Sequence, residues 1–338
     1  MRSLFALVFV GFVVGAYLAV TRIVLPAVRP KVTQGASITT PSSLAAQGRS
    51  VRLLEGPDRY ETSIQVSKQG FPGGAPAVVL VSGNDYPDAL CAGPLAGAYD
   101  GPLLYVPADG LITDLKAELA RLHPAQVFMV GFQNGNALEV QVKAVLAQAT
   151  LTMVAGPDRY QTAALVARQV KAKLGIITKV VVAPSDNFAP ALAVSSLAAA
   201  QGWPVLLVPS KGDVPEVTIQ AFASLGATSA LEVGTSSRLP IADVEQEQGA
   251  DAYQTAALLA QYGLKHGLSF THTALATGGS FPDALCAGPY LAKDKGMLLL
   301  TDNEEVPPAT AGLLTAQSTH IHALDVIGLP GLAKELGG

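Results

Sequence analysis

A set of motifs that recurs three times in the same order is the strongest constraint on how this chain of 338 residues folds. The first motif occurs as GPDRYETS from Gly56, GPDRYQTA from Gly156 and, weakened, GADAYQTA from Gly249. The second occurs as YPDALCAGPL from Tyr86, FAPALAV from Phe188 and FPDALCAGP from Phe281. An aliphatic run and a hydrophobic run ending in glycine follow in each copy. Because the period is about 95 residues, the triplication predicts three modules with cores of their own.

Each repeat alternates short aliphatic runs with longer segments of helical period. In the first repeat the short runs are 77–81, 103–106 and 127–130. Runs that are apolar on both faces are typical of buried parallel strands covered by helices. The predicted fold is therefore α/β, with three parallel-sheet modules after an amino-terminal hydrophobic helix. The predicted divisions are 1–28 (signal peptide or membrane anchor), 29–50 (flexible linker), 51–149 (repeat 1), 150–246 (repeat 2) and 247–338 (repeat 3).

The amino terminus predicts contact with a membrane. Ser3 to Thr21 is a run of 19 residues without a charge, with Arg2 before it and Arg22 after it. About 20 apolar residues span a bilayer core. A small-residue cleavage site at Val14–Ala16 would make the segment a signal peptide, whereas its full length suits an uncleaved anchor. Both alternatives remain open, and we expect the repeats to lie outside the cytoplasm. The larger number of cations after the segment than before it argues weakly against export of the repeats.

The charge distribution argues against a nucleic-acid partner. The formal net charge is -4, and the first 50 residues carry five cations and no anions, so the repeats themselves are acidic. No broad basic face for a phosphate backbone is expected. The two cysteines, Cys91 and Cys286, are too far apart in sequence for a CxxC motif and are expected to be buried free thiols. The alternative is a disulfide, because the two occupy matching positions in repeats 1 and 3 and could pair if these positions converge outside the cell.

The repeated motifs, DRY-x-T-A, then PDAL-x-A-x-P-L-A, then a P-[IV]-L-L strand, resemble the type 2 cell-wall-binding repeat of Gram-positive surface proteins. The resemblance covers residues 51 to about 335. It implies three Toprim-like modules packed as a triangular pseudotrimer at the cell surface. It also implies that they attach non-covalently to an anionic wall polymer such as a teichoic-acid-like polysaccharide.

The aspartate of the first motif predicts a helix cap. Asp58 precedes Glu61 by three residues, which is the spacing of a capping box, and Asp158 and Asp251 stand before glutamines in the same way. Structural capping is therefore the simpler interpretation of these three aspartates.

The arginine of the first motif predicts an anion contact. A cap does not need Arg59 or Arg159, and a planar guanidinium suits phosphate or carboxylate. A salt bridge between modules is the alternative. Repeat 3 has Ala252 at this position, so an arginine-dependent site is lost there.

The second motif places an acidic residue after a proline. Pro87–Asp88 and Pro282–Asp283 predict the first turn of a helix, and repeat 2 has Pro190 instead of the acid. Repeat 2 thus keeps the arginine but loses the acid, repeat 3 does the reverse, and only repeat 1, with Asp58, Arg59, Tyr60 and Asp88, has the full set. The candidate ligand-binding residues are Asp58, Arg59, Tyr60, Asp88, Asp158, Arg159, Tyr160, Asp251, Tyr253 and Asp283.

Catalysis, metals and cofactors have little support in the sequence. The five histidines form no HExxH pattern, and GxSxG, P-loop and dinucleotide-binding motifs are missing. The acidic run Asp302–Glu305 could bridge to an anionic polymer through a divalent cation, but a solvated loop explains it more simply. We therefore expect a non-catalytic wall-binding protein. The alternatives are a membrane-tethered scaffold that binds a protein partner through decayed repeats and, with less support, a wall-modifying enzyme.

Overall fold

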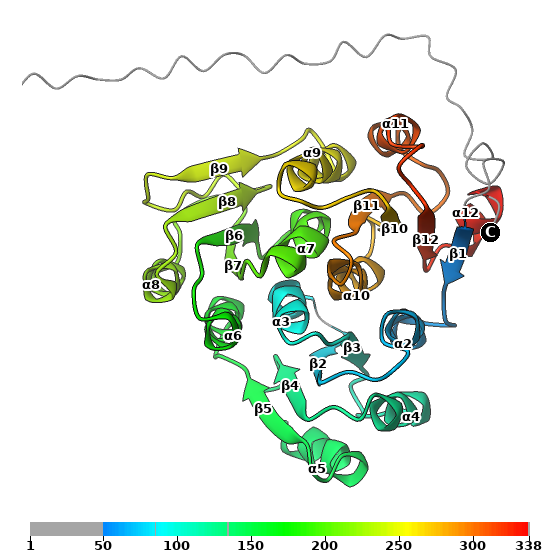
Figure 1. Ribbon diagram of the computed structural model, residues 1–338. Helices are drawn as coiled ribbons and strands as arrows, with labels where there is room; N and C mark the ends of the chain where they lie inside the picture. Colours follow the sequence, from blue (N-terminus) through cyan, green and yellow to red (C-terminus); the bar gives the residue numbers. More distant parts are fainter. Residues whose placement is uncertain (1–49, 85, 134, 337–338) are drawn as a thin grey trace, which may run out of the picture. The chain divides into compact units, whose positions relative to one another are not determined.

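Three parallel β-sheets, each with four strands, organise the described part of the chain (Figure 1). The structure is a computed structural model that describes residues 50–84, 86–133 and 135–336. All of these residues belong to one unit, Thr39–Gly338. The expected α/β class with one parallel sheet for each repeat is confirmed.

Module 1 has the strand order β3-β2-β4-β5. Its strands are β2 (Ala77–Ser82), β3 (Leu103–Val106), β4 (Gln126–Val130) and β5 (Thr150–Val154). Its helices are α2 (Arg59–Gly70), the 3-10 turn η1 (Ala89–Cys91), α3 (Ala92–Ala98), α4 (Thr113–Leu122) and α5 (Asn136–Val145).

Modules 2 and 3 repeat this strand order, β7-β6-β8-β9 and β11-β10-β12-β1. Module 2 consists of β6 (Lys179–Pro184), β7 (Val205–Val208), β8 (Ser229–Val233), β9 (Val244–Glu247), α6 (Arg159–Leu174), α7 (Ala189–Gln201) and α8 (Glu216–Leu225). Module 3 consists of β10 (His272–Thr277), β11 (Met297–Thr301), β12 (Ala323–Ile327), β1 (Ser50–Leu54), α9 (Ala252–Lys265), α10 (Phe281–Ala292), α11 (Pro308–Ala316) and α12 (Pro330–Leu336).

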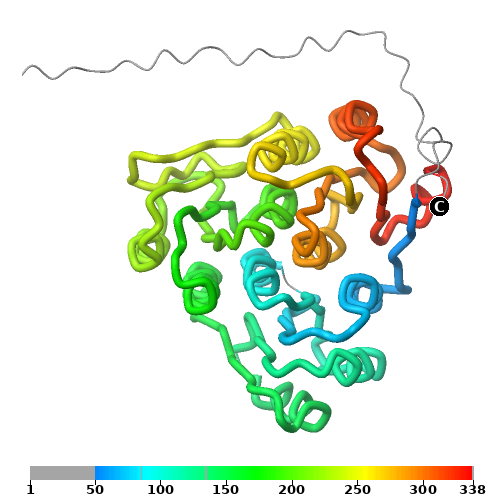
Figure 2. The backbone as a smooth tube through the Cα atoms, in the orientation of Figure 1, coloured from blue at the N-terminus to red at the C-terminus, as the bar shows by residue number. Residues whose placement is uncertain are grey.

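The fourth strand of every sheet comes from the start of another repeat. β5 begins repeat 2 but pairs with β4 of module 1, and β9 begins repeat 3 but pairs with β8 of module 2. The first strand of the described chain, β1, pairs with β12 near the carboxyl end. Figure 2 shows this blue start beside the red final segment. The three modules are therefore joined as a closed ring of strand exchanges.

Each central strand is buried on both faces, as its apolar sequence predicts. Val78 and Leu80 of β2 face a local core shared with α4 and α5, whereas Val79 and Val81 face a larger core that continues into modules 2 and 3. Because the larger core is common to the modules, each module stabilises its neighbours by hydrophobic burial.

The helix that follows the first central strand of each module packs against its two counterparts. α3, α7 and α10 contact one another pairwise. At their amino-terminal ends Tyr86, Phe188 and Phe281 meet, with ring centroids 5.4, 5.8 and 6.4 Å apart. The second motif of every repeat therefore converges on one aromatic cluster, which joins the three modules.

One local prediction needs correction. Pro282 and Asp283 do lie in the first turn of α10, but Pro87 and Asp88 lie in a turn before η1, and α3 begins only at Ala92. The predicted signal peptide or anchor, 1–28, and the predicted linker, 29–50, lie outside the described residues, except for Ser50, which begins β1. Among the helices of residues 50–336 that are described, none is long and apolar enough to span a bilayer.

Candidate functional site

The first motif builds a tight turn between a strand and a helix in all three repeats. The threonine hydroxyls of Thr62, Thr162 and Thr255 accept the N–H groups of Gly56, Gly156 and Gly249 at 3.0–3.1 Å. A Cβ at Gly56 would lie 2.4 Å from the Cβ of Glu61, so the turn requires glycine there. The turn fixes where the next three residues point.

The predicted aspartate caps are confirmed. Asp58 accepts the backbone N–H groups of Tyr60 and Glu61 at 2.8 and 3.0 Å. Asp158 and Asp251 accept those of Gln161 and Gln254 at 2.8 and 2.7 Å. The carboxylates of all three caps are thus engaged in helix starts.

The glutamine or glutamate of each capping box behaves differently from the prediction. The Gln161 amide donates to the Asp158 carboxylate at 3.1 Å, and the Gln254 side chain accepts the Ala250 N–H at 3.2 Å. Neither glutamine side chain accepts the backbone N–H of the capping aspartate, which is the second hydrogen bond of a capping box. Both side chains bond to other partners instead.

The arginine reaches out of the turn toward the end of a strand. Nη1 of Arg59 donates to the carbonyl of Gly83 at 2.6 Å, and Nη1 of Arg159 donates to the carbonyl of Ser185 at 2.9 Å. The guanidinium of Arg59 also lies 5.6 Å from the ring centroid of Phe281, which belongs to repeat 3. Arg59 therefore bridges two modules.

The tyrosine packs within its own module. The hydroxyl of Tyr60 donates to Asn84, that of Tyr160 accepts from Ser185, and that of Tyr253 donates to Asp302, each at 3.1 Å. These rings cover the loops that follow β2, β6 and β11. The three predicted tyrosines thus lie beside the turns but point toward loops of their own repeats.

The acidic residue next to Arg59 comes from another repeat. A cleft of about 240 Å³ is lined by Glu55–Arg59 and Thr62 of repeat 1 and by Ser280, Pro282, Asp283 and Gly328 of repeat 3. We call this contact between the two repeats junction 1. Asp88, which the sequence grouped with Arg59, is not among the residues lining this cleft. The cleft therefore brings Arg59 together with an acidic residue of repeat 3.

Junction 2 is the corresponding contact between repeats 1 and 2. Asp88 lies against Gly131, where an added Cβ would be 2.6 Å from its Oδ2 atom. The Gly131 N–H donates to the carbonyl of Val154 at 3.0 Å, and the side chain of Gln133 donates to the carbonyl of Gly156. Asp88 of repeat 1 thus lies beside the turn that carries Arg159 of repeat 2.

Junction 3 lacks both charged groups. Pro190 occupies the place of the acid against Gly234, where an added Cβ would lie 2.2 Å from its Cγ atom. Ala252 occupies the place of the arginine in the turn of repeat 3. Two junctions therefore have an arginine and an aspartate, and the third has neither.

The electrostatics of junction 1 make Asp283 an unusual carboxyl group. Burial raises its pKa, the charge of Arg59 opposes this, and Glu55 adds to it, giving a pKa of about 6. Gly328, with φ of 68°, allows this side chain to approach the strand end closely. The cleft therefore combines a cation with a carboxyl group that titrates near neutrality.

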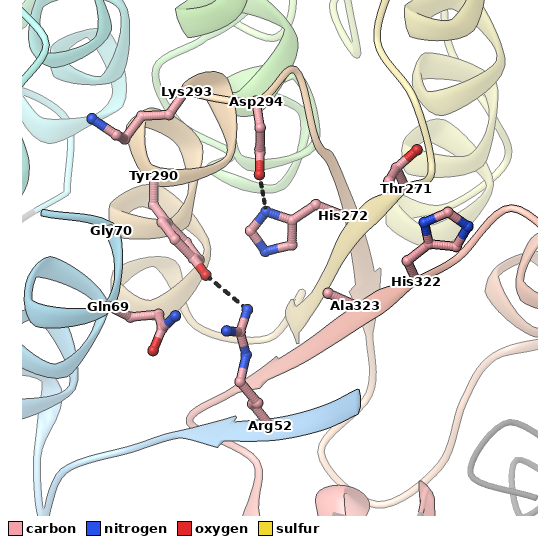
Figure 3. A pocket seen from close by; sticks show the side chains of 10 residues that line it. All are labelled: Arg52, Gln69, Gly70, Thr271, His272, Tyr290, Lys293, Asp294, His322 and Ala323. Carbon is pink, nitrogen blue, oxygen red and sulfur yellow. Dashed lines mark hydrogen bonds and ion pairs between the residues drawn. The ribbon is translucent and has the colours of Figure 1, made fainter. Parts of the chain in front are cut away.

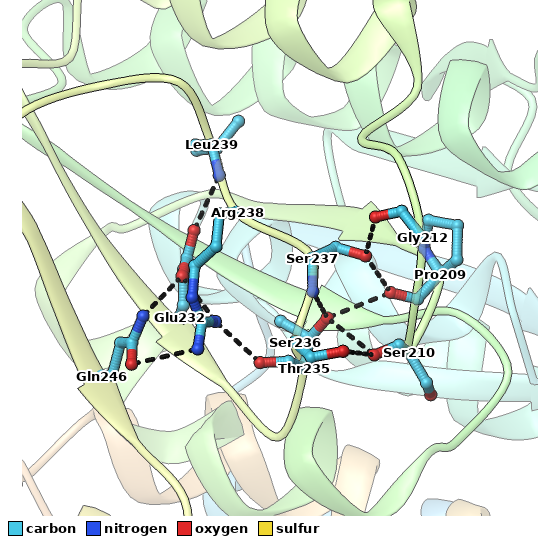
Figure 4. A network of polar contacts seen from close by, with 10 residues as sticks. All are labelled: Pro209, Ser210, Gly212, Glu232, Thr235, Ser236, Ser237, Arg238, Leu239 and Gln246. Atoms are coloured by element: carbon cyan, nitrogen blue, oxygen red, sulfur yellow. Dashed lines mark hydrogen bonds and ion pairs between the residues drawn. The ribbon is translucent and has the colours of Figure 1, made fainter.

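A second cavity, of about 390 Å³, lies at the carboxyl ends of the strands of module 1. Its polar lining includes Ser82, Asp109, Gln133 and Gln141. In module 2 the corresponding loops are tied together, since Ser237 donates to the carbonyls of Pro209 and Gly212, each at 2.9 Å (Figure 4).

Within the described residues no cluster of three or more His, Cys, Asp or Glu side chains is arranged to hold a metal ion. Cys91 and Cys286 are buried free thiols whose Sγ atoms donate to the carbonyls of Asp88 and Asp283. Asp302 of the predicted acidic cluster accepts the backbone N–H of Asn303 at 2.7 Å as well as the hydroxyl of Tyr253.

Comparisons with known proteins confirm the resemblance that the motifs indicated. The family model "Cell wall binding domain 2 (CWB2)" matches residues 54–135, 154–236 and 247–332. The N-acetylmuramoyl-L-alanine amidase LytC of Bacillus subtilis is 30% identical over 80% of this chain and 54% of its own length. The amidase enhancer of the same organism is 25% identical over 81% of this chain and 37% of its own length. The chain thus spans about half or less of the length of these relatives.

Solved structures show the same fold. Cwp6 from Clostridium difficile superposes with a TM-score of 0.72 at 26% identity, covering 86% of this chain and 48% of that one. Cwp8 from the same organism has a TM-score of 0.72 at 23% identity, over 87% and 52% of the two chains.

Proposed function

Because the chain belongs to the cell wall binding domain 2 family, which places it at the cell wall or cell surface, we propose that it attaches non-covalently to an anionic wall polymer. It binds this polymer at junctions 1 and 2 and has no catalytic activity. The three modules act as one pseudotrimer of Toprim-like units around the cluster of Tyr86, Phe188 and Phe281. This protein faces the outside of the cell, with residues 1–28 as a signal peptide or membrane anchor.

The observation that carries this proposal is the joint presence or loss of the arginine and the aspartate. Arg59 and Asp283 line one cleft, Asp88 lies at the Gly131 strand end next to the turn that carries Arg159, and junction 3 has neither an arginine nor an aspartate at these positions. Stability alone does not require this, because junction 3 folds with Ala252 and Pro190. The turn does not need the arginine or the aspartate, yet junctions 1 and 2 have both. We therefore expect both side chains to bind a ligand.

The chemistry of junction 1 suits a polymer that carries both anionic groups and hydroxyls. The exposed guanidinium of Arg59 can bind a phosphate or carboxylate through its remaining N–H groups. The carboxyl groups of Asp283 and Glu55 can accept hydrogen bonds from sugar hydroxyls. Because the acidic groups repel a bulk anion, the polymer must place its charge on the arginine, which makes the contact directional.

Co-sedimentation with purified Gram-positive cell walls tests the proposal, using walls before and after removal of their covalently linked anionic polymers. We expect binding that depends on these polymers and falls at least about 100-fold in the Arg59→Ala plus Arg159→Ala variant, since charge-assisted contacts contribute about 1.5–3 kcal/mol each. The matched control is Arg168→Ala, which removes an exposed arginine of α6 away from the junctions.

The outcomes separate the proposal from its alternatives. Equal binding by stripped walls, or equal loss in the control, would contradict an anion contact at the junctions. Absence of wall binding together with capture of one protein from a cell extract would favour the scaffold. Turnover of wall material would favour an enzyme.

A further inference from the structure

The sheet of module 3 carries buried charges at the amino-terminal end of its strands, opposite to junction 1. The carboxylate of Asp325 is fully buried and accepts Nε of Arg52 at 2.8 Å, Nε2 of His272 at 2.8 Å and the hydroxyl of Tyr290 at 2.6 Å. Nδ1 of His272 lies 2.8 Å from Asp294. We call Arg52, His272, Tyr290, Asp294 and Asp325 the closure cluster. Figure 3 shows four of these side chains around a cavity of about 380 Å³.

The other two repeats provide an internal comparison for this cluster. The strand registers and motif spacing give the matching residues: Phe128 and Leu231 for Asp325, Thr152 and Glu245 for Arg52, Ala77 and Lys179 for His272, and Leu95 and Leu197 for Tyr290. Where module 3 has a buried carboxylate, modules 1 and 2 have apolar side chains. A buried charged network is therefore not a requirement of the fold.

The closure cluster lies where the ring is closed by the most distant strand. Arg52 and Asp325 are separated by 273 residues, whereas the matching pairs on β4–β5 and β8–β9 lie within about 25 residues of each other. In the unfolded chain, an encounter between residues this far apart is less probable than an encounter across the two short connections by a factor of roughly 40 to 90. The chain connection therefore favours the pairing of β1 less than it favours the pairing of β5 or β9.

The positive and negative charges of the closure cluster balance one another. Burial alone would lower the pKa of His272, but its hydrogen bonds to Asp294 and Asp325 outweigh this and raise the pKa to about 9. His272 is therefore charged at neutral pH and, together with Arg52, balances the two carboxylates. Loss of one partner would leave buried charge uncompensated, so the network holds β1 strongly in one register.

The strand that this cluster holds leads directly into junction 1. β1 ends at Leu54, whose carbonyl accepts the N–H of Gly328 at 3.0 Å, and Glu55–Arg59 follow at once. Given the proposed function, we propose that the closure cluster positions junction 1: by holding β1 on β12 it places Arg59 beside Asp283 for the wall polymer. Junction 2 has no such dependence, because β5 is held by its short connection to β4.

Amide hydrogen exchange tests the positioning directly, without any ligand. In Arg52→Thr, which copies Thr152 and leaves Asp325 with His272 and Tyr290, exchange in residues 50–58 is expected to rise about tenfold or more. Exchange in 150–158 should not change, and Arg52→Lys should fall between the variant and the original chain. The matched control is Glu245→Thr, which removes the 2.6 Å ion pair to Lys179 at the corresponding place in module 2. In this control variant, amide exchange in residues 244–251 should rise less than threefold.

Binding to polymer-bearing walls tests the consequence for each junction separately. In an Arg159→Ala background, where junction 1 acts alone, Arg52→Thr should weaken binding about tenfold, and Arg52→Lys should restore part of it. In an Arg59→Ala background, where junction 2 acts alone, the same change should have no effect. A general loss of stability would weaken both backgrounds equally.

Different results would contradict the positioning role of the closure cluster and the proposed wall binding. If exchange in 50–58 stays unchanged in Arg52→Thr, or rises equally in 150–158, the positioning role is wrong whether or not walls are bound. If exchange rises only in 50–58 but walls are never bound, the cluster does position the turn and the proposed ligand is wrong. If exchange rises but both backgrounds bind as before, junction 1 does not depend on the closure cluster.

Discussion

Replacing Asp283 with asparagine is expected to stabilise the protein while weakening its binding. The folded protein holds this carboxyl group at a pKa of about 6, above its ordinary value of 3.8, because burial disfavours the charged form. A raised pKa contributes stability that is complete below the unfolded value and is lost as the pH rises through about 6. Above that pH the ionised Asp283 therefore costs the folded state on the order of 2–3 kcal/mol, at 1.36 kcal/mol for each pKa unit.

Asparagine has nearly the same shape and no charge, so the variant avoids this cost. Urea unfolding at pH 8 should show Asp283→Asn more stable than the original chain by about 2 kcal/mol, and the two should be nearly equal at pH 4. Asp109→Asn is the matched control, since Asp109 is exposed, and it should change stability by less than about 0.5 kcal/mol.

Two results would refute the reasoning. A gain in stability of the same size at pH 4 and pH 8 would mean that the charge of Asp283 is not its source. A loss of stability at pH 8 would mean that the carboxylate makes stronger contacts in junction 1 than Arg59 alone provides. In wall co-sedimentation the same variant should bind less tightly, because a hydrogen-bond acceptor of the cleft is replaced.

Three further predictions concern stability. His272→Ala, which copies Ala77, should remove a loss of about 3 kcal/mol that the original chain shows between pH 6.5 and pH 9, because a raised pKa stabilises the folded state below the unfolded value. Urea unfolding across this range tests it, and an unchanged pH dependence of the free energy of unfolding would contradict it. Tyr105→Phe should cost about 1–2 kcal/mol in urea unfolding, because its buried hydroxyl donates to the carbonyl of Pro282 at 2.9 Å and joins modules 1 and 3; no change would mean that water replaces the bond. Glu118→Gln should lower the thermal midpoint by a few degrees, because it leaves Arg121 with a weaker partner than the 2.6 Å ion pair, and an unchanged midpoint would count against this ion pair.

The sequence predicted the modules well because their signals are local. Buried strands have apolar residues on both faces, and Asp58, Asp158 and Asp251 stand where a helix cap is needed. These features depend on neighbouring residues alone, so a single repeat is enough to recognise them.

The grouping of the site residues could not be predicted in the same way. The sequence suggested that Arg59 and Asp88 share a site, but β1 crosses to module 3 and takes the turn with it, so Arg59 lies beside Asp283. One signal was present: the arginine is lost in repeat 3 and the acid in repeat 2. An offset of one repeat between the two losses is what a site shared by successive repeats would leave.

The closure cluster gave no local signal either. Arg52 and Asp325 look like ordinary strand residues until the strand register brings them opposite each other. Only the comparison of Asp325 with Phe128 and Leu231 marks the position as unusual, and it becomes informative once burial is known.

The pairing of β1 with β12 also bears on how the protein is made. The amino-terminal strand emerges early from the ribosome, but its partner strand follows some 270 residues later. At a synthesis rate of roughly 5–20 residues per second, β1 waits for many seconds with its hydrogen-bonding edge unsatisfied. A chain interrupted before Ala323 can complete modules 1 and 2 but cannot complete the sheet of module 3. Completion of this sheet therefore requires synthesis at least through Ile327, and in products truncated before Ala323 we expect β1 and β10, which both pair with β12, to be open to proteases.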